Sequence, residues 1–250
     1  MVKDLLTLYE PINTLKPVDD GIWIVDGPIV KMSMYGMAIP FTTRMTVVRL
    51  DNDGLWCHSP TELTPTLKAE IDNLGPVEHL ISPNKIHYAH IQSWVDAYPH
   101  AIAWASPGVR ERADSQHIPT TFHADLDDTP PPQWATEIDQ AIVRGSRFLD
   151  EVVFFHRQSK TLILTDLIEN VEPPKIDKAF RWLIHLAGIA DPNGKAPLDL
   201  RMTFWGRKAQ ARKGYEQMLA WAPEKIILAH GRWFQENGVA ELERAFQWLK

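Results

Sequence analysis

The sequence contains a single cysteine, Cys57, and this scarcity sets the first limits on what the protein can be. One cysteine cannot form an internal disulfide, which suits a reducing cytoplasm. A thiolate zinc site is excluded as well, so any metal must be bound by His, Asp, Glu or Asn side chains. Cys57 lies in an apolar run and is expected to be a small core residue, since no activating base is apparent for a nucleophile.

Long hydrophobic runs and an excess of positive charge are also missing. No run approaches the roughly 18 apolar residues of a membrane span, and the first residues lack the apolar core of a signal peptide. We therefore expect a cytoplasmic protein with no membrane partner. The chain has 26 Lys and Arg against 32 Asp and Glu, a net charge of −6, which gives no electrostatic footprint for nucleic acid. The basic stretch at 205–217 is expected to be a solvated surface, and the expected partner is a small molecule.

What remains is the composition of a globular protein of 250 residues, 44% hydrophobic and 23% charged. This length suits one large domain, and we expect a single domain over residues 1–250. The longest loop signal is the acidic, proline-rich stretch at 125–134. The strands on its two sides look like halves of one sandwich, so this stretch is expected to connect the halves rather than to separate two domains.

Predicted strands and helices alternate along both halves of the chain. In the first half, apolar and β-branched runs predict strands at 21–30, 43–50, 55–59, 77–82 and 101–106 and helices at 59–75, 90–99 and 107–114. In the second half, strands are predicted on both sides of a turn at 157–160 and at 225–231, and helices at 175–188, 202–223 and 239–250. This order indicates a layered α/β fold, in which two sheets pack together and helices lie outside.

Three of the predicted strands end in residues that can bind a metal. They read LISPNKIHYAH at 80–90, LILTDLIEN at 162–170 and IILAHG at 226–231. Loops at the carboxyl ends of strands are where α/β proteins hold ligands, so His87, Asp166 and His230 are expected to meet in one pocket. Histidine is the commonest metal ligand and the usual acid or base near neutral pH.

In this order and at this spacing, the three strand ends resemble the metallo-β-lactamase fold. The resemblance is closest to a divergent family of domains of unknown function within that superfamily. Its characteristic pieces are TRMTVVRL at 43–50, HSP at 58–60, EVVFFHRQSKTLILTDLIEN at 151–170 and AHG at 229–231. The resemblance implies an α/β fold: an αββα sandwich of two mixed β-sheets with helices on the outer faces.

Active members of the superfamily bind two metals through seven ligand positions, and this chain resembles them at only three. The matching residues are His87, Asp166 and His230, and the changed positions hold Ser82, Asn84, Ile86 and Arg147. A two-metal hydrolase site of the usual kind therefore cannot be assembled. The resemblance implies at most one divalent ion, Zn, Mn or Fe, in a mixed nitrogen and oxygen site, and otherwise no cofactor.

The turn at 157–160 decides which residue neighbours Asp166. If it closes a hairpin, Asp166 faces Glu151, with side chains about 5 Å apart. His156 then faces Thr161 beside the turn, about 16 Å along the strand from Asp166. Glu151 is therefore the preferred fourth metal ligand, and His156 is expected to lie away from the site.

Three further residues are candidates for contact with a substrate. His58 ends an early strand that faces the same cleft in this fold, Asn84 shares the loop of His87, and Trp233 follows His230 closely. His90, one helical turn after His87, is expected to have a surface or capping role.

Two functions of different classes fit this pattern. The first is a hydrolase of a small ester, thioester or phosphoester, with His87 and Asp166 at the catalytic centre and at most one metal to activate water. The second is a non-catalytic module that binds a small ligand on the same scaffold and has lost its metals. The polar residues kept at three strand ends favour the hydrolase, and the changed ligand positions favour the binding module.

Overall fold

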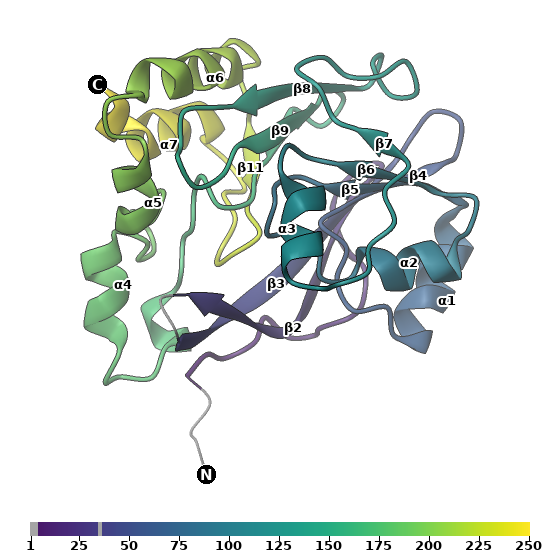
Figure 1. The fold of residues 1–250 in the computed structure, drawn as a ribbon, viewed down its shortest axis with the longest axis horizontal. Coiled ribbons are helices and arrows are strands. Elements are labelled where there is room, and N and C mark those ends of the chain that lie inside the picture. The colour runs from purple at the N-terminus through teal and green to yellow at the C-terminus, as the bar shows by residue number, and fades with distance from the viewer. Residues whose placement is uncertain (1–4, 35–36) are drawn as a thin grey trace.

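The computed structural model describes the backbone of residues 5–34 and 37–250, and the side chains of residues 5–31 and 39–250. It confirms the predicted αββα sandwich: two mixed sheets pack face to face, and helices cover their outer faces (Figure 1). Among the described residues, no helix is both long and apolar enough to cross a membrane.

The first sheet has seven strands in the part of the chain that is described, arranged in chain order. They are β1 (Lys16–Asp19), β2 (Ile22–Met34), β3 (Met37–Arg49), β4 (Leu55–His58), β5 (Val77–Ser82), β6 (Ile102–Ala105) and β7 (Ala124–Asp125). Strands β1 to β4 are antiparallel, and β4 to β7 are parallel. The parallel part needs crossover helices, which are α1 (Pro65–Leu74), α2 (Ile91–Ala97) and α3 (Val109–Ser115).

The second sheet has four strands among the described residues, in the order β11-β10-β9-β8. They are β8 (Ile138–Val143), β9 (Glu151–His156), β10 (Thr161–Ile163) and β11 (Lys225–Ile227). The helices of this half are α4 (Arg181–Ala187), α5 (Leu198–Thr203), α6 (Lys208–Ala220) and α7 (Gly238–Ala245), with short 3₁₀ turns at Pro173–Lys175 and Gln247–Leu249. Helices α5 to α7 lie beside this sheet, and α4 lies below α5 along the same side (Figure 1).

The period-2 alternation of side chains along each strand builds three apolar layers. On β4, Leu55 and Cys57 face the cluster under α1 to α3, while Trp56 faces the cluster between the sheets. On β9, Phe154 enters the same inter-sheet cluster, and Val153 faces the helices of the second half. Trp56 and Phe154 are fully buried, each contributing about 1.5–3 kcal/mol through burial.

Several predicted elements have different bounds in the structure. The first helix begins at Pro65, because the Thr64 hydroxyl accepts a hydrogen bond from the Leu67 amide and caps the helix. The helix predicted at 202–223 is two helices, α5 and α6, separated by a turn in which Gly206 has a positive φ of 75°. Strands β1, β7 and β8 were not predicted, since they are short or, in β8, mix polar with apolar residues.

The connections place the three metal-ligand candidates beyond strand ends that face each other. The stretch at 125–134 joins β7 of the first sheet to β8 of the second, as predicted. Strand β5 ends shortly before His87, β10 before Asp166 and β11 before His230. Strands β10 and β11 are parallel neighbours, so their carboxyl ends lie at one edge of the second sheet.

Candidate metal centre

His87, Asp166 and His230 form a cluster at this edge, as the sequence predicts. Each offers one ligand atom, and these atoms all lie within 4.8 Å of one another. The His87 Nε2 atom is 3.3 Å from Asp166 Oδ2, and the His230 Nε2 atom is 3.4 Å from Asp166 Oδ1. The carboxylate therefore lies between two imidazoles contributed by different sheets.

The hydrogen bonds of His230 fix which of its nitrogens is free. Its Nδ1 atom is 2.7 Å from the carbonyl oxygen of Thr42, and a carbonyl can only accept, so Nδ1 carries the proton. In the neutral ring, the Nε2 lone pair then faces the Asp166 carboxylate, which is also an acceptor. Two acceptors in contact need a proton or a cation between them. This is the tautomer in which a histidine binds a metal through Nε2, and the Thr42 carbonyl oxygen holds it by accepting the Nδ1 proton.

The spacing of the cluster suits a metal ion. Zinc bonds of roughly 2.0–2.1 Å in a tetrahedron separate two ligands by about 3.4 Å, close to the distance of each histidine nitrogen from the nearer Asp166 oxygen. The two histidines approach different oxygens, and the ligand atoms of the three residues spread over up to 4.8 Å, so the cluster would contract around an ion. The His87 Nδ1 atom is 2.7 Å from the Ser59 hydroxyl, which orients this second ring in turn. Three protein ligands on one ion would leave at least one coordination position for water or substrate.

The electrostatics keep Asp166 in the anionic form that a metal requires. Burial alone would raise the pKa of the Asp166 carboxyl, but His87 and His230 in their protonated forms outweigh burial and hold this pKa well below its usual range. A metal cation bound in place of these protons would act in the same direction. The Asn84 amide also donates a hydrogen bond to Asp166 Oδ2 over 2.6 Å.

Asn84, predicted to contact a substrate, is fully engaged inside the protein. Its Nδ2 atom donates to Asp166 and, over 2.9 Å, to the Thr165 hydroxyl, while its Oδ1 accepts from the Ile86 amide over 2.9 Å. Asn84 is completely buried. The Asn84 side chain therefore turns its N–H donors toward Asp166, while its oxygen is already bonded to the Ile86 amide. In two-metal members of the fold that this chain resembles, a metal ligand stands at this position.

Glu151 was predicted as the fourth ligand, and this assignment needs correction. The register is as predicted: Thr161 pairs with His156, and Glu151 neighbours Asp166. The Glu151 carboxylate, however, accepts the backbone N–H groups of Thr165 over 2.7 Å and of Asp166 over 2.9 Å. Glu151 is outside the ligand cluster and fixes the backbone that carries Asp166. Burial and the Asp166 charge raise its pKa to about 7.

Of the other two predicted substrate contacts, His58 is buried and Trp233 packs partly buried against the core. The His58 ring stacks on Trp56, with centroids 5.5 Å apart, and burial together with the nearby His87 lowers its pKa to about 3. A neutral His58 thus borders the cluster without joining it. Trp233 packs against the inter-sheet cluster and does not line the pocket beside His230. His156 bonds Ser159 near the turn, away from the site as predicted.

A largely apolar pocket of about 190 Å³ opens directly beside the cluster, with His230 in its wall. Three segments far apart in the sequence enclose it: the N-terminal residues 5–9, the β3 residues 39–42, and the region around α4. Its apolar lining includes Leu5, Leu6, Ile39, Phe41, Val171, Ile176, Phe180, Leu183, Ile184 and Ile189. A molecule in this pocket would present its reacting group to the cluster.

Glu169 also lines this pocket and was not singled out from the sequence. Its side chain is buried at the pocket wall. Burial raises its pKa to about 7, although the nearby His230 acts in the opposite direction. An acidic residue inside the apolar run LILTDLIEN is the signal that could have identified it, since a buried carboxylate needs a partner.

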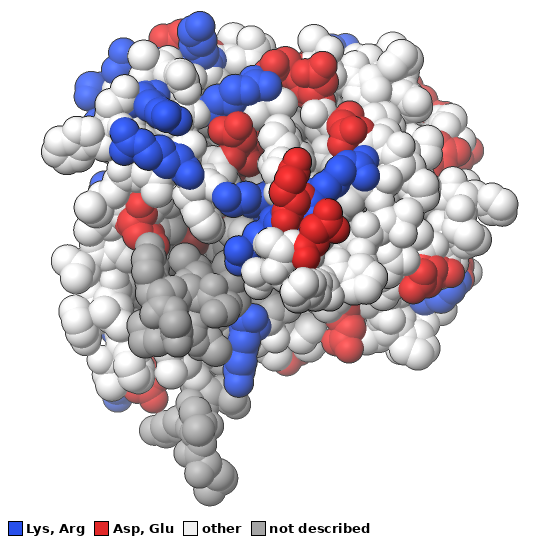
Figure 2. Space-filling model, viewed as in Figure 1, with Lys and Arg blue, Asp and Glu red and all other residues white. Residues whose placement is uncertain are grey.

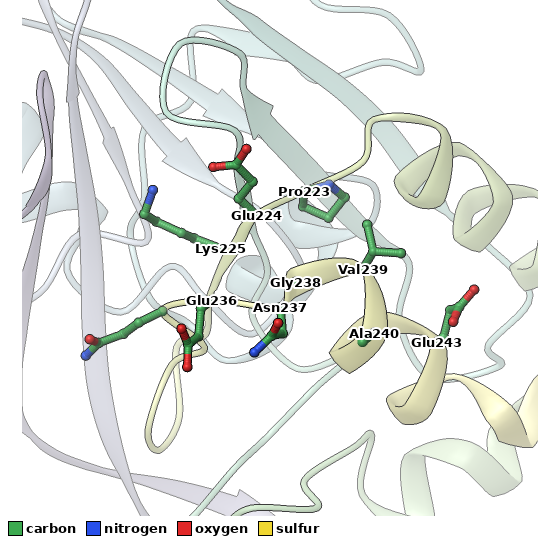
Figure 3. A pocket seen from close by; sticks show the side chains of 10 residues that line it. Pro223, Glu224, Lys225, Glu236, Asn237, Gly238, Val239, Ala240 and Glu243 are labelled. Atoms are coloured by element: carbon green, nitrogen blue, oxygen red, sulfur yellow. The ribbon is translucent and has the colours of Figure 1, made fainter.

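A second hollow lies at the opposite end of β11 and has no relation to the cluster. It is lined by residues 223–225 before and at the start of β11, and by residues 235–240 and Glu243 around the start of α7. Its labelled side chains spread outward from the loop and helix rather than converging (Figure 3). With no histidine in its wall, this hollow lacks the chemistry of the first pocket.

The loop that carries His230 is anchored from below by Arg44 of β3. This buried guanidinium donates to the carbonyl oxygens of Leu228 and Gly231, each over 2.7 Å, and pairs with Asp26 over 2.7 Å. Gly231 has a φ of 92°, and a Cβ there would lie 2.2 Å from the Asn170 carbonyl oxygen. Only glycine fits this position, directly after the histidine.

Comparison with known proteins agrees with this architecture. The family model for DUF4336, a domain of unknown function, matches residues 19–209. No curated protein matches the sequence significantly.

Solved structures that are similar share the metallo-β-lactamase fold at low identity. The DIM-1 metallo-β-lactamase exposed to ceftazidime is 14% identical, with a TM-score of 0.62, over 99% of this chain and 98% of the other. Rubredoxin oxygen:oxidoreductase from Desulfovibrio gigas is 14% identical, with a TM-score of 0.60, over 94% of this chain and 61% of the other. FIM-1 from Pseudomonas aeruginosa, in a mono-zinc form, is 12% identical, with a TM-score of 0.56, over 94% of both chains. At these identities the likeness shows the fold alone.

Proposed function

The chain belongs to the DUF4336 family on a metallo-β-lactamase fold, and from this premise we propose that it hydrolyses a small ester or thioester with one metal ion. The observation that carries the proposal is the approach of His230 Nε2 to the Asp166 carboxylate at 3.4 Å, a contact that needs a proton or a cation between the two groups, beside an apolar pocket. A solved structure of this fold in a mono-zinc form supports the idea that one ion is sufficient on this scaffold.

An ion held by His87, Asp166 and His230 would supply a water of lowered pKa and a Lewis acid for the carbonyl group of the substrate. The protein contributes the orientation of all three ligands. The Thr42 carbonyl fixes the His230 ring, the Ser59 hydroxyl fixes the His87 ring, and Asn84 holds the Asp166 carboxylate. Nitrogen and carboxylate ligands suit Zn, Mn or Fe, so this donor set does not select among them.

The pocket narrows the substrate class. Its volume of about 190 Å³ exceeds that of an engineered cavity of roughly 150 Å³ that binds benzene, so an aromatic ring or a short acyl chain fits it. Its described lining is mostly apolar, and the one lysine in it, Lys175, already donates to the Leu8 carbonyl oxygen and lies over the Tyr9 ring. Such a wall suits an apolar acyl group better than an anionic phosphoryl group. Among the three substrate classes expected from the sequence, we therefore favour a neutral ester or thioester over a phosphoester.

The alternative is a non-catalytic module that binds an apolar ligand in the same pocket. The hydrogen bonds of Asn84 favour this alternative. Asn84 stands at one of the changed ligand positions, and its side chain is bonded within the protein instead of being free to bind a metal. The two functions differ in turnover, because the module would bind ligands without hydrolysing them.

Hydrolysis of a series of esters and thioesters, from acetyl to dodecanoyl, tests the proposal. With the metal-loaded protein we expect kcat/KM to peak near hexanoyl, the length that fills the pocket. Leu183→Trp narrows the pocket and is expected to lower kcat/KM for hexanoyl roughly tenfold, with little effect on acetyl. Leu186→Trp, on the same helix but outside the pocket lining, is the matched control. Binding of hexanoyl compounds without turnover would favour the module.

A further inference from the structure

The α4–α5 face, defined by residues 180–205, exposes an unusual amount of apolar surface. Seven of the nine large apolar side chains exposed among the described residues lie in it: Phe180, Trp182, Leu183, Leu186, Leu198, Met202 and Trp205. Trp182, Leu186, Met202 and Trp205 are each more than 60% exposed. A monomeric protein rarely keeps so large an apolar patch without using it.

The helical spacing shows that this surface is organised. On α4, Leu186 lies one turn from both Trp182 and Leu183, and the opposite side buries Ile184. On α5, Leu198 and Met202 are likewise one turn apart. Helices α4 and α5 lie one above the other along the same side of the molecule (Figure 1). Helix α4 thus carries apolar side chains on its outer as well as its buried side, with Arg181 and His185 between them, as expected for a helix that is covered on its outer side too.

The charge around this face is opposite in sign to that of the whole chain. Between residues 175 and 213 the sequence has nine Lys and Arg against three Asp and Glu, although the net charge of the chain is −6. Basic side chains gather over the side of the molecule where α5 and α6 lie (Figure 2). Lys178, Arg207 and Lys213 are exposed members of this group.

From the apolar face and its basic surroundings we infer that the α4–α5 face docks on an anionic lipid surface. Tryptophan and leucine insert at the boundary of headgroups and acyl chains, while Lys and Arg contact anionic headgroups. A second copy is disfavoured, because in a two-fold dimer the same basic face would meet itself. Nucleic acid would also bind the basic residues through its phosphates, but it would make no use of the exposed apolar side chains of Leu186 and Met202. From the sequence we expect no membrane partner, because no apolar run is long enough to span a membrane. Docking on the surface of a membrane needs no such run.

The face is continuous with the pocket, since Phe180 and Leu183 belong to both. An apolar molecule leaving the lipid surface would therefore reach the His230 side of the pocket without crossing water. The docking stands whether or not the protein is a hydrolase, and its test needs no turnover.

Co-sedimentation of the full chain with lipid vesicles tests this inference. At low salt we expect binding to vesicles of equal parts phosphatidylcholine and phosphatidylglycerol, and little binding to phosphatidylcholine alone. Salt at about 0.5 M should weaken it, because surface charge is then screened. The double variant Trp182→Ser/Leu186→Ser should lower the partition coefficient roughly tenfold or more. Ile118→Ser, an exposed apolar residue elsewhere, is the control.

Both altered positions are exposed, so circular dichroism and melting should match those of the unaltered protein. Lys178→Gln/Arg207→Gln should reduce the salt-sensitive part of the binding. The inference is overturned by equal binding of the double serine variant, by the lack of any preference for anionic vesicles, or by tighter binding to RNA than to vesicles. A dimer that the double serine variant abolishes would also overturn it.

Discussion

Replacing Asp166 by asparagine is expected to abolish metal binding and, with it, hydrolysis. The substitution keeps the shape of the side chain but removes the negative charge between His87 and His230. Two neutral imidazoles rarely hold a divalent ion against buffer. The loss of affinity should therefore exceed the roughly 10–100-fold that is lost when a residue that only hydrogen-bonds to a ligand is removed.

Calorimetric titration with zinc or manganese and thermal melting measure this effect. An ion that binds only the folded protein stabilises it by about 2.7 kcal/mol at a hundred times its Kd. The melting temperature of the unaltered protein should rise with added metal, and that of Asp166→Asn should not. Asp125→Asn, a largely exposed carboxylate outside the cluster, should behave like the unaltered protein. If Asp166→Asn bound zinc or manganese as tightly as the unaltered protein does, Asp166 would not be a metal ligand.

Replacing Arg44 by methionine is expected to cause the largest loss of stability among single changes near the site. It leaves Asp26 without its buried partner and the carbonyls of Leu228 and Gly231 without their donor. Breaking a buried pair costs roughly 3–5 kcal/mol. The partly exposed Lys16 still contacts Asp26, which places the expected loss near the lower end, about 3 kcal/mol.

Urea unfolding measures this loss, and metal affinity gives a second readout. Because Arg44 anchors the loop that carries His230, Arg44→Met should also weaken metal binding in protein that remains folded. Arg49→Met, an exposed position on the same strand, is the matched control and should change stability by about 0.5 kcal/mol or less. If the two variants were equally stable, Arg44 would not anchor the loop as the structure indicates.

The sequence predicts the three ligands because local signals are sufficient for them. An apolar run followed by His or Asp marks a strand end, and the turn at 157–160 fixes the hairpin register. The neighbour of Asp166 is therefore predicted correctly as Glu151. What the register cannot predict is the direction of the carboxylate, which turns to two backbone N–H groups that lack other partners.

The pocket and Glu169 depend on contacts between distant parts of the chain. Residues 5–9 reach the pocket by pairing near residue 175, where the Thr7 amide donates to the Lys175 carbonyl. No periodic pattern in either segment encodes that contact. His58 and Trp233 were misjudged for a related reason. Their positions in the chain point to the cleft, but the His58 ring is buried against Trp56, and Trp233 is partly buried against the inter-sheet cluster.

The metal content of untagged protein, after incubation with zinc or manganese and removal of the excess, tests the central claim most directly. Elemental analysis against a protein concentration from quantitative amino-acid analysis should give one equivalent per chain. The cluster of His87, Asp166 and His230 predicts this value, because Asn84 fills the place of a further ligand with hydrogen bonds. Two equivalents, or none with either ion, would contradict the account.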